Sequence, residues 1–473
     1  MRPRKLHTEN ADSFFPRVLV VTQYPFNLQH GAGIALSNYF HGWPEANLAQ
    51  LCIDDPVVRP DFSVCKNIFL LSINQLRPIW PLRMYLDWRH GKLSKKNIEH
   101  SRESYIGKIK NFKRNEKKNS EDTDLRRKSR SSLKGWVENI LAELGFFENT
   151  VCRITPDLDK FIQDFRPEIV FSTLGDIAFS KLPRQICSRY GAKSVVHITD
   201  DWMSYFRHRN FASMVLTPLM YWQVYLTVRH AHLRYSICET MAQAYEIRFK
   251  TSFQPLISPV KISDWKVRES EDNVYTENPE SELTVLYAGT IYPFSQGDSL
   301  KDISSSIARL REDGMNVQLV ISTPKEFIQR YSRDFDNDGT RIIEYKSRED
   351  LPNLFRTVDA LVIPVVFDDV KIKFARYSMP AKIIAYMATG VPMLVYGPSV
   401  VPAVIEANKY GFAHTATTRD PEYLKNEINR LLTDSKLRVE ISSKALTRVR
   451  DNYELEKVTG KFRQNLCELV DSK

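Results

Sequence analysis

The chain has 473 residues, 42% of them hydrophobic and 26% charged, which is ordinary for a soluble globular protein. One hydrophobic core rarely extends over so many residues, so we expect two domains. The six cysteines are scattered and form no C-x-x-C pair, which excludes a disulfide framework or a zinc site and favours a reducing compartment.

The first 16 residues are basic but have no apolar h-region, so we expect an N-terminal tail there and not a secretory signal. From residue 17 onward, short β-branched runs alternate with helical patterns. Nearly continuous apolar runs such as VLVV and ALVIPV are typical of parallel strands that helices cover on both faces. The expected strands are residues 18–22, 48–53, 68–72, 168–173, 194–199 and 235–238 in the first half, and 283–287, 317–322, 341–345, 360–365 and 393–396 in the second.

Two segments interrupt this alternation. The first is a basic insertion at about residues 77–150, and the second is the polar, acidic stretch 264–282, which we expect to be a linker. The sequence therefore predicts a Rossmann-like N-terminal domain at residues 17–263 and a second such domain at residues 283–450, with a final helix at residues 451–473. The predicted fold class is α/β, with two doubly wound domains facing a cleft.

The positive charge is concentrated in the insertion. Residues 89–134 hold sixteen Lys and Arg against six Asp and Glu, a net +10 that equals the formal charge of the whole chain. The insertion begins with IWPLRMYLDW, and aromatic rings beside cations suit an anionic membrane surface. Binding to nucleic acid is the weaker alternative. A solvated insertion, or a helix packed on its parent domain, fits the same composition.

Residues 211–228 contain no charged side chain and just reach the length of a membrane span. Ser213, Thr217, Pro218, Gln223 and Thr227 interrupt this stretch. A helix that is buried in protein or lies at an interface is therefore favoured over a true span.

Two glycines follow the first strand. Gly31 and Gly33 stand just before a helical pattern, where glycine lets backbone N–H groups approach a ligand at the helix N-terminus. With Asp54 about twenty residues on, the pattern has some likeness to a dinucleotide fingerprint. That fingerprint needs a tight turn directly after the strand and a third glycine, whose place Leu36 occupies. A loop at the expected domain cleft is the better interpretation.

The fifth expected strand ends in VVHITDDWMSYF. Ligand-binding residues of open α/β sheets gather at the carboxyl ends of strands, so we expect this end to face the cleft. His197, Asp200 and Trp202 are candidates for its acceptor side, and Thr199 and Asp201 are expected to point toward the same cleft. The Asp-Asp-Trp run is a better site candidate than His197. His197 within a strand is also typical of a core histidine. Asp200 also fits the cap of the following helix.

The second domain opens with LTVLYAGTIYPF, in which Gly289 and Thr290 lie where a strand turns toward a helix. Backbone N–H groups and a hydroxyl there can hold a diphosphate, although an ordinary tight turn has the same sequence pattern. Further on, Lys373, Arg376 and Lys382 lie around a helix that begins near Pro380 and ends before a glycine. Cations beside a helix N-terminus fit a phosphate site, and solvated lysines are the alternative.

Taken together, in order and spacing, four segments resemble the GT-B glycosyltransferases. The resemblance is closest to the retaining family 4-like enzymes that include lipopolysaccharide and exopolysaccharide hexosyltransferases. It covers residue 17 to the C-terminus apart from the insertion and the linker. The segments are VLVVTQYPF…GAG, SICETMAQAYEIRF, VLYAGTIYPF and SMPAKIIAYMATGVPMLVYG.

The resemblance implies a hexosyltransferase that takes a nucleotide-diphosphate sugar as substrate, without cofactor or metal, and a lipid-linked or growing glycan as acceptor. It places the protein in the cytoplasm, at the inner face of the cell membrane. Lys373, Arg376 and Lys382 would then be the catalytic cations that neutralise charge on the leaving diphosphate. Gly33, Gly289 and Thr290 would contact the diphosphate, and Gly31 would lie on the acceptor side.

The sequence departs from the family at two donor-binding positions. Ala385 stands where the family has a glutamate that binds the ribose hydroxyls, and Tyr377 stands where many members have an earlier glutamate. An alanine side chain forms no hydrogen bond. A catalytically silent partner of an active transferase is therefore one alternative function. A nucleotide-sugar isomerase of the same fold is another, although the sequence shows no convincing carboxylate pair for general acid–base catalysis.

Overall fold

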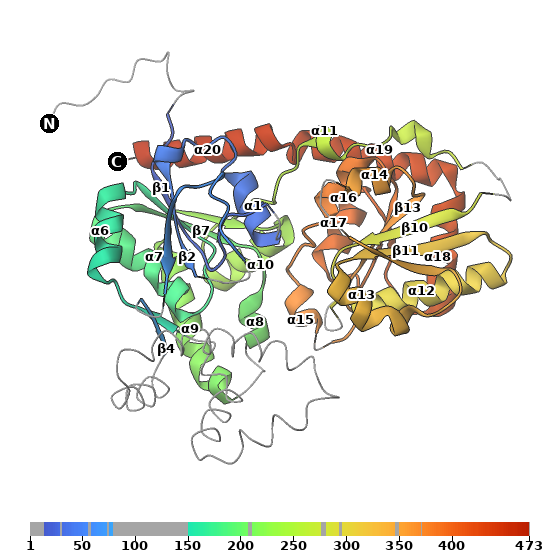
Figure 1. The fold of residues 1–473 in the computed structure, drawn as a ribbon, viewed down its shortest axis with the longest axis horizontal. Helices are drawn as coiled ribbons and strands as arrows, with labels where there is room; N and C mark the ends of the chain where they lie inside the picture. The colour runs from blue at the N-terminus through green and yellow to red at the C-terminus, as the bar shows by residue number, and fades with distance from the viewer. Residues whose placement is uncertain are drawn as a thin grey trace.

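The structure is a computed structural model that describes residues 14–28, 31–54, 58–72, 75–78, 150–206, 211–275, 281–292, 296–345, 350–369 and 371–472. It contains two α/β domains side by side, each built on a parallel sheet between helices (Figure 1). The predicted pair of doubly wound domains is confirmed.

The N-terminal sheet has the strand order β3-β2-β1-β6-β7-β8-β9, and all neighbours run parallel. The order reverses at β1 and β6, which is the crevice where open α/β sheets bind ligands. Its strands are β1 (Val18–Val21), β2 (Leu48–Ile53), β3 (Asn67–Leu71), β6 (Ile169–Ser172), β7 (Lys193–Ile198), β8 (Leu233–Ser236) and β9 (Gln254–Pro255). Its helices include α1 (Gly31–Tyr39), α6 (Pro156–Phe165), α7 (Ile177–Tyr190), α8 (Trp202–Phe206), α9 (Phe211–His230) and α10 (Glu239–Phe249).

The C-terminal sheet has the order β12-β11-β10-β13-β14-β15, again parallel throughout. Its order reverses at β10 and β13. The strands are β10 (Leu283–Ala288), β11 (Val317–Thr323), β12 (Thr340–Glu344), β13 (Ala360–Pro364), β14 (Met393–Tyr396) and β15 (His414–Ala416). The helices are α12 (Gly297–Glu312), α13 (Lys325–Tyr331), α14 (Leu351–Phe355), α15 (Ile372–Ala375), α16 (Ile383–Thr389), α17 (Pro402–Tyr410), α18 (Pro421–Thr433), α19 (Ser435–Asn452) and α20 (Leu455–Asp471).

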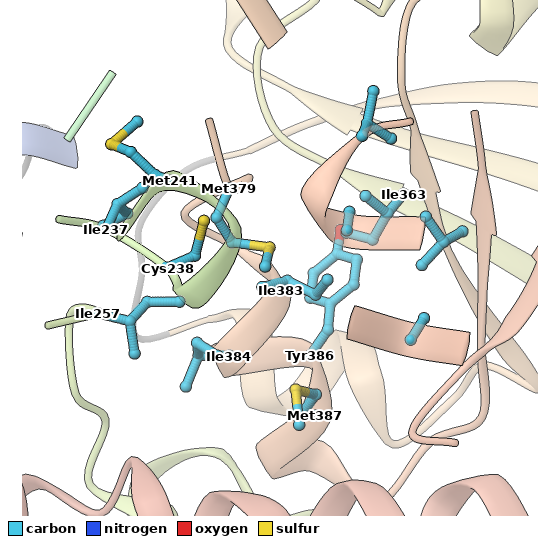
Figure 2. Close-up of a cluster of buried hydrophobic side chains, with 14 of the residues drawn as sticks. Ile237, Cys238, Met241, Ile257, Ile363, Met379, Ile383, Ile384, Tyr386 and Met387 are labelled. Carbon is cyan, nitrogen blue, oxygen red and sulfur yellow. The ribbon is translucent and has the colours of Figure 1, made fainter. Parts of the chain in front are cut away.

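The central strands are apolar along their whole length because helices bury both of their faces. Every residue of β1 and of β13 is buried, as expected for parallel strands in the middle of a layered domain. One apolar cluster continues across the domain boundary. Figure 2 shows Ile237, Cys238 and Met241 of the N-terminal domain next to Met379 and Ile383 of the C-terminal domain.

The last helix, α20, returns to the N-terminal domain. Figure 1 shows α19 and α20 running along one side of both domains. Phe462 of α20 is fully buried there, and its ring centroid lies 5.4 Å from that of Phe40 in an edge-on arrangement. The chain therefore connects its two domains twice, once through residues 256–282 and once through the α19–α20 junction.

The segment expected to be a linker contains short helical turns. It includes α11 (Ile262–Trp265) and a 3-10 turn at Ser270–Asn273. Asn273 is buried, and its side-chain amide donates to the carbonyl oxygen of Gly390 at 2.8 Å. These contacts fasten the segment to the C-terminal domain, and its polar composition concealed them.

The predicted insertion leaves the N-terminal domain from a small antiparallel ribbon. Strand β4 (Leu76–Pro78) pairs with β5 (Thr150–Cys152), so the two ends of the insertion lie side by side. Residues 79–149, which carry the predicted basic and aromatic character, lie outside the described residues. Within the described part of the chain, none of the helices combines the length and the hydropathy that crossing a membrane requires.

Candidate functional site

The end of β10 carries the first candidate residue. Gly289 has a φ of +145°, a backbone conformation that side chains of L-residues rarely adopt. Its N–H donates to the carbonyl oxygen of Ser322 at 2.8 Å, which fixes the turn. A Cβ at this position would collide with the ammonium nitrogen of Lys382. The glycine therefore leaves room for that ammonium group at the point where the strand order of the sheet reverses.

Lys382 reaches Gly289 from the residue before α16. Its Nζ donates to the carbonyl oxygen of Ala288 at 2.8 Å and lies 3.9 Å from the ring centroid of Tyr287. No carboxylate pairs with it among the described residues. Burial lowers the pKa of Lys382 to about 7, because an isolated ammonium loses its hydration there. An anion that enters the site would supply the missing charge partner.

A second side chain of α16 holds the same strand end. The hydroxyl of Tyr386 accepts from the N–H of Ala288 at 2.8 Å, one helical turn after Lys382. Figure 2 shows Tyr386 among the buried side chains of this region. Because both residues bind Ala288, the start of α16 and the Gly289 turn form one rigid unit.

The turn after Gly289 is held by hydrogen bonds to Thr290. Its carbonyl oxygen accepts from the hydroxyl of Tyr287 at 2.6 Å and from the side-chain amide of Gln296 at 2.6 Å. Gln296 stands directly before α12. The turn, the strand and the following helix are thereby fixed in one arrangement.

The remaining predicted cations lie on or just after α15. Lys373 and Arg376 are both exposed. The guanidinium of Arg376 lies 5.9 Å from the ring centroid of Tyr377. Tyr377 itself faces the N-terminal domain, where its ring centroid is 6.5 Å from that of Tyr245 and its carbonyl oxygen accepts from the thiol of Cys238 at 3.6 Å. This loop therefore lies on the boundary between the domains.

Ala385, the position of the absent glutamate, lies in the first turn of α16. It is half-buried and packs at the edge of the apolar cluster that spans both domains. The methyl group is consistent with that packing and offers no hydrogen bond to a ligand.

The glycine loop of the N-terminal domain begins α1. Gly33 is buried, and a Cβ there would lie 2.8 Å from the carbonyl oxygen of Pro25 and would collide with the side chain of Asn27. Gly31 is exposed and has open space around it. Close backbone packing therefore explains Gly33, whereas the space that a Cβ at Gly31 would enter is open. The described contacts do not join either glycine to the C-terminal domain.

His197 lies in the core, which is the alternative that its position in a strand allowed. It is fully buried, its Nε2 lies 3.0 Å from the carbonyl oxygen of Leu256, and its ring packs edge-on against that of Tyr39 at 5.2 Å. Burial lowers the pKa of His197 to about 4, so the imidazole is neutral. These contacts place it inside the N-terminal domain and away from the residues grouped at the boundary.

The two neighbouring aspartates have different surroundings. Burial raises the pKa of Asp200, and hydrogen bonds from Ser378 and Thr199 offset part of that effect. Ser378 belongs to the C-terminal domain and follows Tyr377, so Asp200 meets the other domain. Trp202 opens α8, which lies next to α15 across the boundary, and its ring is half-buried.

Asp201, the middle residue of the Asp-Asp-Trp run that the sequence directed toward the cleft, forms a buried ion pair. Its carboxylate accepts from Arg248 at 2.8 Å, from the hydroxyl of Tyr245 at 2.7 Å and from the hydroxyl of Ser204 at 2.6 Å. The sequence did not show which of the two adjacent aspartates would form an ion pair, because the partner Arg248 is 47 residues away in the chain.

The structure thus brings two sets of predicted residues together. Gly289, Thr290 and Lys382 form one set at the end of β10. Asp200, Trp202 and Tyr377 lie along the domain boundary, with Arg376 beside Tyr377. Among the described residues, no cluster of three or more His, Cys, Asp or Glu is arranged to bind a metal ion.

Comparisons with known proteins agree with this fold. Residues 282–434 match a family model described as glycosyl transferases group 1. No curated protein sequence matches the chain significantly.

Solved structures match nearly the whole chain. Sucrose-phosphate synthase from Thermosynechococcus elongatus has a TM-score of 0.58 at 11% identity, over 97% of this chain and 100% of that one. HepE of Anabaena in complex with UDP has a TM-score of 0.57 at 12% identity, over 96% and 100%. The UDP-forming α,α-trehalose-phosphate synthase of Burkholderia vietnamiensis has a TM-score of 0.53 at 11% identity, over 97% and 100%. At these identities the likeness shows the fold, which is that of the GT-B glycosyltransferases.

Proposed function

We propose that the protein is a glycosyltransferase that moves a hexose from a nucleotide-diphosphate sugar to a lipid-linked or growing glycan, with retention of configuration. The family match of residues 282–434 supports the reaction class. One observation carries the proposal. Lys382 is half-buried, and its ammonium lies against Gly289 with no carboxylate partner among the described residues, at the place where a doubly wound sheet binds phosphates.

The chemistry follows from where charge develops. As the glycosyl–phosphate bond stretches, negative charge grows on the leaving diphosphate and the sugar gains oxocarbenium character. Lys382 is rigidly held by Ala288, so it neutralises that charge without having to reorganise. Lys373 and Arg376 are exposed and would close on the diphosphate from solvent. Retention by attack from the leaving-group face needs no side-chain nucleophile.

The acceptor would approach from the N-terminal domain. Gly31 is exposed at the start of α1, and Asp200 and Trp202 lie along the domain boundary. We place the reaction in the cytoplasm, at the inner face of the membrane, because the proposed acceptor is lipid-linked or part of a growing glycan. No resident cofactor or metal takes part in the proposed reaction.

The test is release of nucleotide from UDP-, GDP- and ADP-sugars by the purified protein, with and without lipid-linked and glycan acceptors. UDP-sugars come first because the Anabaena structures of similar fold contain UDP and UDP-glucose. We expect release with one nucleotide, and Lys382→Met should lower it at least tenfold. Release by no sugar nucleotide with any acceptor would contradict the proposal.

One observation favours a second candidate, a silent partner that binds the donor without transfer. Ala385 removes the carboxylate that would hold the ribose, at a cost of about 1.5–3 kcal/mol, or roughly ten- to a hundredfold in affinity. Ala385→Glu should therefore tighten nucleotide binding in calorimetry. Ala381→Glu is the control, because it adds the same charge at an exposed position of the same segment. Equal affinities for both variants would mean that residue 385 does not face the ribose.

A further inference from the structure

Between residues 217 and 228, the outward face of α9 is mainly apolar, and the polar side chains there are buried or bound to α7. Thr227 donates its hydroxyl proton to the carbonyl oxygen of Ser180 at 2.5 Å, and Gln223 accepts from Arg184 of α7 at 2.7 Å. Thr217 is buried as well. Between residues 218 and 226 the exposed or half-exposed side chains are apolar or aromatic apart from Gln223, and they are Pro218, Leu219, Tyr221, Trp222, Tyr225 and Leu226.

This arrangement is the opposite of that on an ordinary solvent-exposed helix. A helix on the surface of a soluble domain normally turns its polar side chains outward. Leu219 is 46% exposed and Trp222 is 54% exposed, and Tyr221 is exposed beside them. Clustered exposed apolar side chains of this kind mark an interaction surface, whereas single ones are ordinary.

The aromatic side chains of this face are held in place by others. The ring of Trp222 stacks on that of Tyr225 with centroids 5.9 Å apart, and the ring of Tyr221 stacks on that of Phe249 at 6.1 Å. These stacked rings hold the side chains of Tyr221 and Trp222 in one conformation. Little side-chain conformational entropy would therefore be lost when a binding partner covers the face.

The charges around this face identify what covers it. Residues 211–228 carry no charge. The last turn of α9 holds the exposed Arg229, whose guanidinium donates to the carbonyl oxygen of the exposed Lys250. Trp and Tyr beside cations are typical of the headgroup region of a bilayer, where the rings lie at the interface and the cations meet anionic lipids.

The basic segment of the sequence enters and leaves the domain at the same end. Thr150 of β5 donates to Asp176, the N-cap of α7, at 2.7 Å, and Arg184 of the same helix binds α9. Figure 1 shows β4 and α9 together at one end of the N-terminal domain. Residues 89–134, with their net +10, lie in the sequence between β4 and β5, and β5 packs on α7, the helix that also contacts α9.

We propose that the outward face of α9, centred on Leu219, Tyr221 and Trp222, docks on a bilayer that contains anionic lipid. The helix lies in the interface and does not span the membrane. Helix α8 lies next to both α9 and α15, so the docked end includes the boundary between the two domains. Docking goes beyond the proposed transfer reaction and needs neither donor nor turnover.

The test is sedimentation of the full-length protein with vesicles of phosphatidylcholine alone and with roughly 30% phosphatidylglycerol. We expect binding to the anionic vesicles that weakens as salt is raised. The double variant Leu219→Ser, Trp222→Ser should bind at least about tenfold more weakly, because it removes two apolar side chains from the interface. Val400→Ser is the control, since Val400 is equally exposed on the C-terminal domain.

The results separate this proposal from the transfer reaction. Nucleotide binding by the double variant, measured without lipid, should equal that of the wild type and shows that the variant is folded. Wild-type protein that stays in solution with both vesicle types would overturn the proposal, and so would equal sedimentation of the double variant and the wild type. A concentration-dependent dimer that the double variant abolishes would instead assign the face to a second copy of the chain, and would overturn it too.

Discussion

The ammonium of Lys382 occupies the space that a side chain at Gly289 would need. The two residues are 93 positions apart, yet both are held at the end of β10, Lys382 through the carbonyl oxygen of Ala288 and Gly289 through that of Ser322. The glycine turn and a half-buried cation thereby meet at the place where the strand order reverses. This pairing is the reason that we propose the turn as the anion site.

Gly289→Ala should abolish nucleotide binding. The Cβ would displace the ammonium of Lys382, and the φ of +145° would add strain of about 1–3 kcal/mol. Calorimetry with the nucleotide diphosphate identified by the release assay should show at least a tenfold loss of affinity. Gly314→Ala is the matched control, because Gly314 also has a positive φ, +93°, but open space around it. It should lose stability while keeping affinity.

Nucleotide binding should take up a proton above pH 7. Burial lowers the pKa of Lys382 to about 7 from its ordinary value of about 10.4, so the free enzyme holds a neutral amine at pH 8. A bound diphosphate favours the ammonium and raises that pKa. Affinity should therefore fall by up to about tenfold per pH unit above 7. Calorimetry in buffers of different ionisation enthalpy measures the uptake.

Lys382→Arg is the control for this proton. Arginine stays charged at every pH used, so the variant should bind without taking up a proton. If uptake persists in the variant, a group other than Lys382 is being titrated.

Asp200→Asn and Asp201→Asn should separate activity from stability. Asp201→Asn leaves Arg248 without its buried partner and should lower the free energy of unfolding by about 2–4 kcal/mol. The loss is somewhat smaller than for a fully buried pair because Arg248 is partly exposed. Asp200→Asn should unfold like the wild type, since burial already raises the pKa of Asp200, but should lower transfer at least tenfold. Thermal unfolding and the release assay measure the two effects. Equal loss of stability in both variants would place Asp200 in the structural ion pair as well.

Much of the fold was predictable because each buried parallel strand forms a short, continuous apolar run that can be recognised in the sequence. Runs such as VLVV and ALVIPV are apolar along their whole length, and the predicted strands at residues 48–53 and 393–396 agree with β2 and β14 residue for residue. Strands β9 and β15 were missed because they have only two and three residues, too few for a periodic signal.

The site was harder to predict because its contacts join distant parts of the chain. Glycines at strand ends pointed to Gly289, but only the fold brings Lys382 against it. Aspartates at a strand end pointed to Asp200, yet the partner that buries Asp201 comes from α10. The return of α20 to the N-terminal domain depends on Phe462 fitting among rings from other elements, which no local pattern encodes.

Glu406→Gln should stabilise the protein above pH 7. Glu406 of α17 is buried, its Oε1 has no partner among the described residues, and Arg448 lies 3.8 Å from its Oε2. Burial raises the pKa of Glu406 to about 7, and Arg448 offsets only part of that effect. The folded chain therefore holds a proton that the unfolded chain releases near pH 4.3, so stability falls as pH rises from about 4.3 to 7. The variant should remove this fall and gain about 1–3 kcal/mol at pH 8.

Glu239→Gln should change stability at high pH in the opposite direction. Glu239, like Glu406, lies 3.8 Å from Arg448. Burial acts to raise the pKa of Glu239, but Lys409 and Tyr410 of the other domain, each within 2.7 Å, hold it below its usual range. A carboxylate with a lowered pKa contributes stability above the unfolded pKa and loses it as pH falls, so this variant should be less stable than the wild type at pH 8 and nearly equal to it at pH 3. Urea unfolding of both variants across that range gives the comparison. Curves that shift in the same direction would show that neither carboxylate titrates on its own, because Arg448 also lies 3.8 Å from Glu239.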